Sequence, residues 1–211
     1  MAKLNIQQIN SKLANSNSLK ALATNNANTK LQYHKNVLID GFLEDSITKE
    51  IDEGNSGRSS SNFTSLKGGN LFTFIGFNEG DVPSVKVVDM LESKIQFKNR
   101  APKISFQKGT INYRWEINAP SEQDLIAAAP LPFDSAKSWL RGIEDGIFGL
   151  TAYIYWKIGV GRSGGGLEAK DGSGNLKQLR SDEFTGKGKD SYIGKYLNKF
   201  LAAIGRTKYS G

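Results

Sequence analysis

The sequence predicts an α+β protein, in which helices pack on a small antiparallel β-sheet and amphipathic helices stand near both ends of the chain. Hydrophobic residues form 38% of the 211 residues, which is enough to build a packed core. Apolar residues recur at helical spacing in some segments and alternate with polar residues in others. These segments lack the regular strand–helix–strand order of a parallel sheet, so an antiparallel sheet is favoured.

The N-terminal segment predicts an amphipathic helix over residues 3–23, where leucines and isoleucines recur at partly helical spacing among polar residues. The stretch that follows, ATNNANTK at residues 23–30, is entirely polar or small and predicts a break. Apolar residues return over 31–42. This segment is interpreted either as a second helix that ends near Gly41 or as a continuation of the first.

The chain is accordingly divided into two parts. Residues 1–30 form an N-terminal helix with a polar linker, and residues 31–211 form a single α+β domain. Two long loops rich in Gly and Ser are expected in that domain, at residues 55–70 and 159–175. We expect both loops to become ordered on contact with neighbouring molecules.

Four segments predict β-strands. Residues 46–54 alternate isoleucines with polar residues, and residues 71–77, LFTFIGF, form a short aromatic run bounded by glycines. Residues 103–107 and 110–120 also read as strands, the second with regular alternation of apolar side chains.

Three further segments predict helices. Residues 82–97 have a proline near their start and place valines and leucines on one face. Residues 190–205 repeat aromatic and aliphatic residues at helical spacing and close at a glycine. A proline-stiffened entry leads into the third helix, residues 139–156, for which Asp134 or Ser135 is the expected N-cap.

The helix predicted at residues 139–156 contains three glycines, and each costs roughly 1 kcal/mol relative to alanine. On a helical wheel, Gly142, Gly146 and Gly149 form a narrow stripe beside the apolar face that begins at Trp139. A bare stripe of this kind lets another backbone approach closely. The approaching partner is either the protein's own sheet or a neighbouring subunit.

The sequence offers little that could carry catalysis. It has no cysteine and one histidine, His34, and its acidic pairs are adjacent in sequence, so their side chains diverge. GVGRSG at residues 159–164 matches the glycine pattern of dinucleotide loops, but further glycines follow it where that motif requires a helix. A nucleotide-dependent enzyme is therefore the least favoured interpretation. We expect a protein that is not an enzyme and has neither cofactor nor metal site.

Charge is unevenly distributed along this basic chain, whose net charge is +7. Residues 1–35 carry five lysines and no acid, whereas residues 36–95 carry ten acids and five bases. Such segregation allows copies to pair, positive region against negative. Basic residues interleave with aromatics between residues 98 and 115 and again in the C-terminal region, residues 186–200. This pattern makes sequence-nonspecific nucleic-acid binding the alternative function. The residues expected to face DNA are Lys98, Arg100, Lys103 and Lys108.

No targeting or membrane-spanning segment is predicted. The N-terminal sequence lacks the apolar core of a signal peptide. The most apolar run, residues 146–160, is too short and too charged at its ends to span a bilayer. We therefore expect a soluble protein.

Four motifs together resemble one group of tailed-bacteriophage virion proteins. In chain order they are GNLFTFIGF, PLPFDSAKSWLRGIEDGIFGL, GRSGGGLEAK and YIGKYLNKFL. Each motif is short, but their order is similar to that in neck or tail-completion proteins, which join the phage head to the tail. The resemblance extends from about Leu38 to Ile204.

This resemblance implies a small α+β fold without catalysis and a homo-oligomeric ring, expected as a hexamer or dodecamer. The ring would join the portal-connector to the tail tube or tail terminator proteins of the virion, after synthesis in the host cytoplasm. Basic side chains on its inner wall would tolerate passing DNA. The implied assembly residues are the three glycines with Trp139 and Arg162. Tail-completion, tail-terminator and minor tail roles stay open, because all three need an assembling surface without chemistry.

Overall fold

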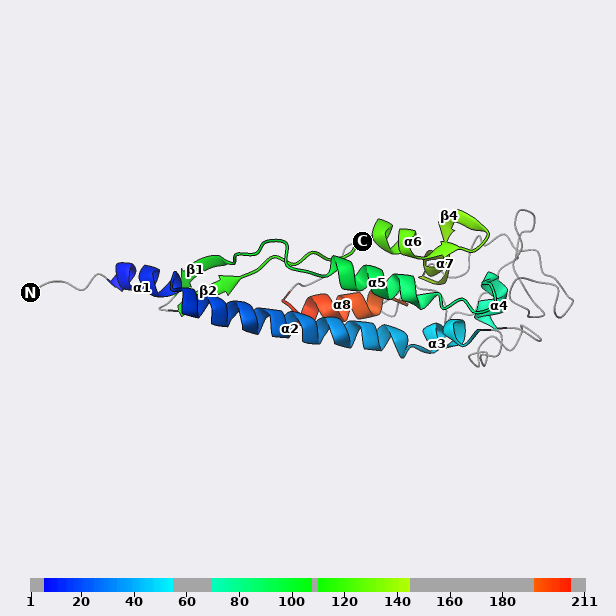
Figure 1. Cartoon of the computed structure of the whole chain (residues 1–211), viewed down its shortest axis with the longest axis horizontal. Helices are drawn as coiled ribbons and strands as arrows, with labels where there is room; N and C mark the ends of the chain where they lie inside the picture. Colours follow the sequence, from blue (N-terminus) through cyan, green and yellow to red (C-terminus); the bar gives the residue numbers. More distant parts are fainter. Residues whose placement is uncertain (1–5, 55–69, 108–109, 145–191, 206–211) are drawn as a thin grey trace, which may run out of the picture.

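The computed structural model describes residues 6–54, 70–107, 110–144 and 192–205, and the structural statements below concern these residues (Figure 1). It confirms the α+β fold class. Eight helices accompany two small antiparallel sheets of two strands each within this described part. The elements are arranged along one long helix, α2, so the molecule is elongated (Figure 1).

Helix α1, Ile6–Ala14, and helix α2, Asn17–Leu43, form the N-terminal third of the described chain. The break between them lies at Ser16, whose side chain caps α2 by accepting a hydrogen bond from the Leu19 amide at 3.2 Å. With 27 residues, α2 is about 40 Å long.

The polar break predicted at residues 23–30 is wrong, because α2 continues through it. This stretch contains neither glycine nor proline, so nothing in it forces the backbone out of a helix. The hydroxyls of Thr24 and Thr29 donate to the carbonyls of Lys20 and Asn25, four residues earlier, so both hydroxyls have hydrogen-bond partners within the helix.

Two predicted strands are also wrong, since residues 46–54 contain helix α3, Ser46–Asp52, and residues 71–77 contain helix α4, Leu71–Ile75. Isoleucines four residues apart in α3 fit a helical face as well as an alternating strand. Asn70 and Thr73 form a reciprocal capping box at the start of α4, and Gly76 ends it in the left-handed conformation. All five residues of α4 are buried, so the segment has no exposed polar face whose spacing could distinguish a helix from a strand.

Helix α5, Ser84–Lys94, confirms the helix predicted over 82–97. Strands β1, Lys103–Gln107, and β2, Thr110–Arg114, confirm the two strands predicted there and pair antiparallel, although β2 ends before residue 120. An isolated antiparallel bridge between Phe97 and Ile117 joins the segment that precedes β1 to the segment that follows β2.

Helix α6, Glu122–Ala128, was not predicted, although Ser121 and Asp124 form a capping box at its start. Strands β3, Pro130–Leu131, and β4, Asp134–Ser138, then form a second hairpin that leads to helix α7, Trp139–Glu144. The expected N-cap at Asp134 or Ser135 is wrong. Both residues lie in β4, and the Ser138 hydroxyl accepts the hydrogen bond from the Arg141 amide instead.

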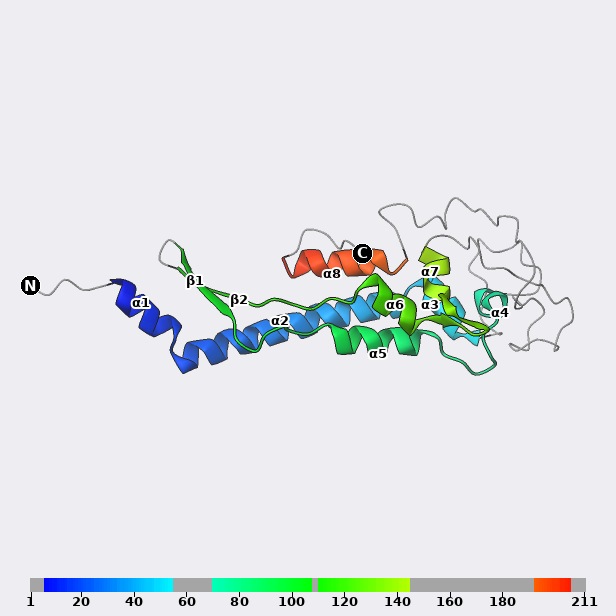
Figure 2. The ribbon, with the colours of Figure 1, turned by 90° about the horizontal axis from the view of Figure 1, so that it is seen from above.

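Helix α8, Gly194–Ala203, confirms the predicted C-terminal helix, and Gly205 after it has a positive φ of 94°. Helix α2 lies between α5 and α8 (Figure 2). These helices bury a core with α3, α4, α6 and α7 that includes Phe42, Phe72, Leu91, Trp139 and Leu197. No helix among the described residues is both long and apolar enough to cross a membrane.

The described chain therefore has two regions. We call residues 6–30 together with 98–116 the arm, and the remaining described residues the head. The arm contains α1, the first half of α2 and the β1–β2 hairpin, which lies beside them (Figure 1). Ala14 is the only buried residue among the arm's described side chains, whereas every other buried residue lies in the head.

Candidate assembly surface

The described residues include only some of the predicted assembly residues. Trp139 is 2% exposed and packs edge-on against Phe77 in the head, with ring centroids 5.9 Å apart. Gly142 is half-buried in α7. Gly146, Gly149 and Arg162 lie outside the described residues, as does the loop at 159–175. The glycine stripe is therefore described at its first position alone.

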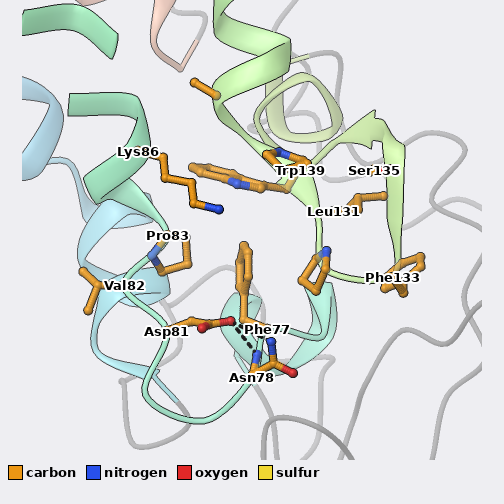
Figure 3. A pocket seen from close by; sticks show the side chains of 13 residues that line it. Phe77, Asn78, Asp81, Val82, Pro83, Lys86, Leu131, Phe133, Ser135 and Trp139 are labelled. Carbon is orange, nitrogen blue, oxygen red and sulfur yellow. Dashed lines mark hydrogen bonds between the residues drawn. The ribbon is translucent and has the colours of Figure 1, made fainter. Parts of the chain in front are cut away.

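A cavity of about 530 Å³ opens beside Trp139. It lies between the loop before α5, the first turn of that helix and the β3–β4 hairpin (Figure 3). Phe77, Pro83 and Phe133 supply much of its lining. Lys86 extends into it (Figure 3). The lining combines apolar side chains with the cation of Lys86 and the polar side chains of Asn78, Asp81 and Ser135.

Asp81 also lines this cavity, and its carboxylate accepts hydrogen bonds from a neighbouring loop residue. Its Oδ2 accepts hydrogen bonds from the Asn78 backbone amide at 2.9 Å and from Asn78 Nδ2 at 3.1 Å (Figure 3). These bonds fix the loop that forms one wall. The acid is therefore part of the wall's scaffold.

A cluster of titratable groups fastens α8 to the junction of α2 and α3. Asp45 Oδ2 accepts from Lys195 Nζ at 2.5 Å and from the Tyr196 hydroxyl at 2.8 Å, while Oδ1 accepts from the Ile47 amide as the N-cap of α3. Burial and the bond to this carboxylate raise the pKa of Tyr196, so the hydroxyl stays protonated at neutral pH.

Nearby, the hydroxyls of Thr48 and Tyr192 are hydrogen-bonded to each other at 2.5 Å, and burial raises the pKa of Tyr192 well above its ordinary value. Gly41 allows α2 to approach α8 closely, because a Cβ there would lie 2.9 Å from the Tyr196 ring. The cluster thus joins two helices that are distant in sequence.

Glu144 is also used for structure. Its two carboxylate oxygens accept from the amides of Ile193 and Gly194 at 3.0 and 3.1 Å, at the start of α8. Negative charge is favourable at a helix N-terminus. His34 lies on α2 beside Tyr33, their rings 5.1 Å apart. No group of three or more acids or histidines that could hold a metal ion occurs in the part of the chain that the structure describes.

The residues expected to face DNA lie on the arm. Lys98, Arg100 and Lys103 are exposed, and Lys108 falls outside the described residues. Lys103 forms an ion pair with Glu116, and Lys98 Nζ lies 4.0 Å from the same carboxylate. The sequence reasoning did not single out Arg114, which is exposed directly across the hairpin from Lys103.

An apolar stripe runs along the outer side of α2. Its side chains are between 36% and 63% exposed. At 100° per residue they lie within about 60° of one another, roughly opposite the buried residues of the same helix. Lys30 and Asn26 fall on the same side. The stripe consists of Leu19, Leu22, Tyr33 and Val37. We call these residues with Lys30 the α2 stripe.

A second exposed stripe lies on α5. Val82 and Val85 are each 49% exposed, and Asp89 and Glu92 follow them at helical spacing. The Val85 amide donates to the Val82 carbonyl at 3.3 Å, so the helical path reaches back to Val82. Neither Asp89 nor Glu92 forms an ion pair with any described residue. We call these four residues the α5 stripe.

The tip of the arm adds further exposed apolar groups. Ile9, Leu13 and Phe106 are each at least 40% exposed. The hairpin is tied to α1 by a hydrogen bond from the Tyr113 hydroxyl to the Ala14 carbonyl at 3.0 Å. An isolated two-stranded hairpin is only marginally stable in water. The arm therefore displays apolar side chains without a core of its own.

Comparisons with protein-family models, with curated proteins and with solved structures found no match.

Proposed function

We propose that this protein is a non-enzymatic virion structural protein of the neck or tail-completion type. Its copies form a homo-oligomeric ring that joins the portal-connector to the tail tube or tail terminator and lets DNA pass. The observation that supports this most strongly is the arm, which exposes several apolar side chains and, among its described side chains, buries only Ala14.

Exposed apolar surface of this extent is characteristic of proteins that associate. The α2 stripe spans 19 residues, from Leu19 in the arm to Val37 in the head, or about 27 Å of helix. Burying apolar surface contributes about 25 cal/mol per Å². The arm therefore has most to gain in free energy when a neighbouring molecule buries its apolar side chains, because few of its described side chains are buried within the subunit.

The titratable groups of the head support the non-enzymatic part of the proposal. Asp45 and Glu144 fasten α8, and Glu50 accepts from the Leu71 amide at 2.8 Å to support α4. In each case the carboxylate meets a helix terminus or a neighbouring side chain, so it acts as a structural group.

Mass photometry and sedimentation velocity of the purified protein test the ring. A closed ring gives one discrete species that does not grow as the protein concentration rises, and its mass distinguishes a hexamer from a dodecamer. Mass spectrometry of purified phage particles then tests the virion role. A protein that stays monomeric up to high micromolar concentration and is missing from particles would refute the proposal.

Sequence-nonspecific nucleic-acid binding is the second candidate, favoured by the exposed basic side chains of the arm. The arm's two ranges contain eight basic residues and one acid, Glu116. Each neutralised phosphate lowers log K by about 0.9 per unit of log salt concentration. Replacing Lys98, Arg100 and Lys103 by alanine should therefore reduce the slope by about 3.

The matched control replaces three exposed head lysines, Lys49, Lys86 and Lys137, by alanine. DNA affinity that does not respond to salt, or that falls equally in both triple variants, argues against binding through the arm.

A further inference from the structure

We propose that the α2 stripe of one copy packs antiparallel on the α5 stripe of the adjacent copy. This inference depends on the proposed function, since it identifies the two surfaces that meet at each contact of the ring. A contact between two different surfaces can repeat around an axis and close into a ring.

The two stripes are complementary in charge. From Asn17 to Ile39, α2 carries three lysines and no acid, and Lys30 lies within the exposed stripe. The α5 stripe carries Asp89 and Glu92, both exposed and without an ion-pair partner among the described residues. Lys35 Nζ reaches the Glu92 backbone carbonyl at 3.4 Å, which leaves the Glu92 carboxylate available.

The spacing of the residues also matches when the helices run in opposite directions. In α2, Lys30 is followed by Tyr33 and Val37, at intervals of three and four. In α5, reading backward from Asp89, Val85 and Val82 follow at intervals of four and three. An antiparallel contact thus sets Lys30 against Asp89, Tyr33 against Val85 and Val37 against Val82. The same antiparallel arrangement places Glu92, one turn after Asp89 on α5, near Lys30.

The two stripes do not meet within one subunit. The bond from Lys35 to Glu92 places α5 on the inner side of α2, because residue 35 lies roughly opposite the stripe on the helical wheel. Val82 and Val85 stay half-exposed in the described structure. Only a second copy can bring the stripes together.

Pairing of one α2 stripe with another is less favourable. Two α2 stripes would bring basic helices together with no acid on the stripe to balance Lys30. Such a contact would also be symmetric, so it would close a dimer and leave the α5 stripe uncovered.

Cysteine cross-linking tests the contact directly, because the chain contains no cysteine of its own. One preparation of the full chain carries Lys30→Cys and another carries Asp89→Cys. The two are mixed under assembly conditions and oxidised mildly. A disulfide requires Cα atoms within about 7 Å, so we expect a disulfide-linked dimer in the mixture and none in either preparation alone. Gln32→Cys mixed with Gln123→Cys is the control, since both positions are exposed and lie off the stripes.

Charge reversal gives an independent readout. Lys30→Glu and Asp89→Lys should each weaken assembly about tenfold or more, because like charges then face each other. The two substitutions combined in one chain should restore it, since every contact again pairs opposite charges.

The outcomes separate this inference from the proposed function. If the wild-type protein forms its oligomer but the mixture gives no disulfide, or if Lys30→Cys cross-links to itself, the stripe contact is refuted and the ring survives. Loss of assembly in both reversals without rescue by the combined variant also refutes the contact. A wild-type protein that never oligomerises refutes the proposed function and this inference together.

Discussion

The head and the arm use their apolar residues in opposite ways. Along α2 itself, Leu38 and Phe42 are buried against the rest of the head, while Leu19 and Leu22 in the arm are 36% and 58% exposed. The same helix therefore serves as a core element and as a display surface. Mutations of the buried residues should change the free energy of unfolding of the subunit, whereas mutations of the arm's exposed residues and of the two stripes should change its association.

The largest effect is expected from Phe42→Ala. Phe42 is fully buried and packs near Tyr192, with ring centroids 5.7 Å apart. Truncating a buried phenylalanine costs about 3–5 kcal/mol, through lost burial and the cavity left behind. Urea unfolding should show this loss. A change below 1 kcal/mol would mean that α8 does not pack on α2 as described.

Asp45→Asn should cost about 2 kcal/mol, because it leaves Lys195 and Tyr196 without a buried anion. Asparagine still serves as a helix N-cap, so the loss of stability measures the effect of removing the negative charge. Glu44→Gln is the matched control, since Glu44 pairs with Lys49 on the exposed surface, where ion pairs contribute at most about 1 kcal/mol. Equal losses in the two variants would contradict the buried cluster.

Asp124→Asn should have a smaller, pH-dependent effect. A hydrogen bond from Lys94, and then bonds from the backbone and side chain of Ser121, lower the pKa of Asp124 from 3.8 to about 2. Because the folded-state pKa is the lower one, ionisation stabilises the fold above about pH 4, and this contribution is lost as pH falls toward 2.

The variant should therefore be less stable than the wild type at pH 7, by no more than about 1 kcal/mol for this partly exposed group. The gap between their melting temperatures should narrow between pH 4 and pH 2. A gap that is constant over this range would exclude the ionised carboxylate as its cause.

The smallest effect on subunit stability is expected from Leu22→Ser. Leu22 is 58% exposed on the arm, so the free energy of unfolding should change by less than about 0.5 kcal/mol. Assembly, measured by mass photometry, should weaken, while Gln32→Ser on another side of α2 should leave it unchanged. An unfolding change as large as that of Phe42→Ala would show that the arm has a core.

Sequence patterns located the elements whose periodicity is long or strongly alternating. Helices α5 and α8 and the β1–β2 hairpin belong to this group. The patterns failed where a short run fits two periods. In α4 every residue is buried, and the capping box of Asn70 and Thr73 was the local signal that could have identified a helix. Ser121 and Asp124 offered the same signal for α6.

The candidate assembly surface was harder to predict, because exposure is a property of the whole fold. The apolar residues of α2 lie on two nearly opposite sides, so their spacing does not reveal which side is buried. Only the positions of α5 and α8 distinguish Leu38 from Val37. The glycine stripe predicted beyond Gly142 lies outside the described residues, so it stays a prediction.

The contacts of Glu144 with the first amides of α8 have one further consequence. Together with the Asp45 bonds and the buried side chains of Leu197 and Phe200, they attach the last helix to the described helices by non-covalent contacts. A protease cut between residues 145 and 191 should therefore leave two polypeptides that co-purify, and separately expressed fragments should complement each other.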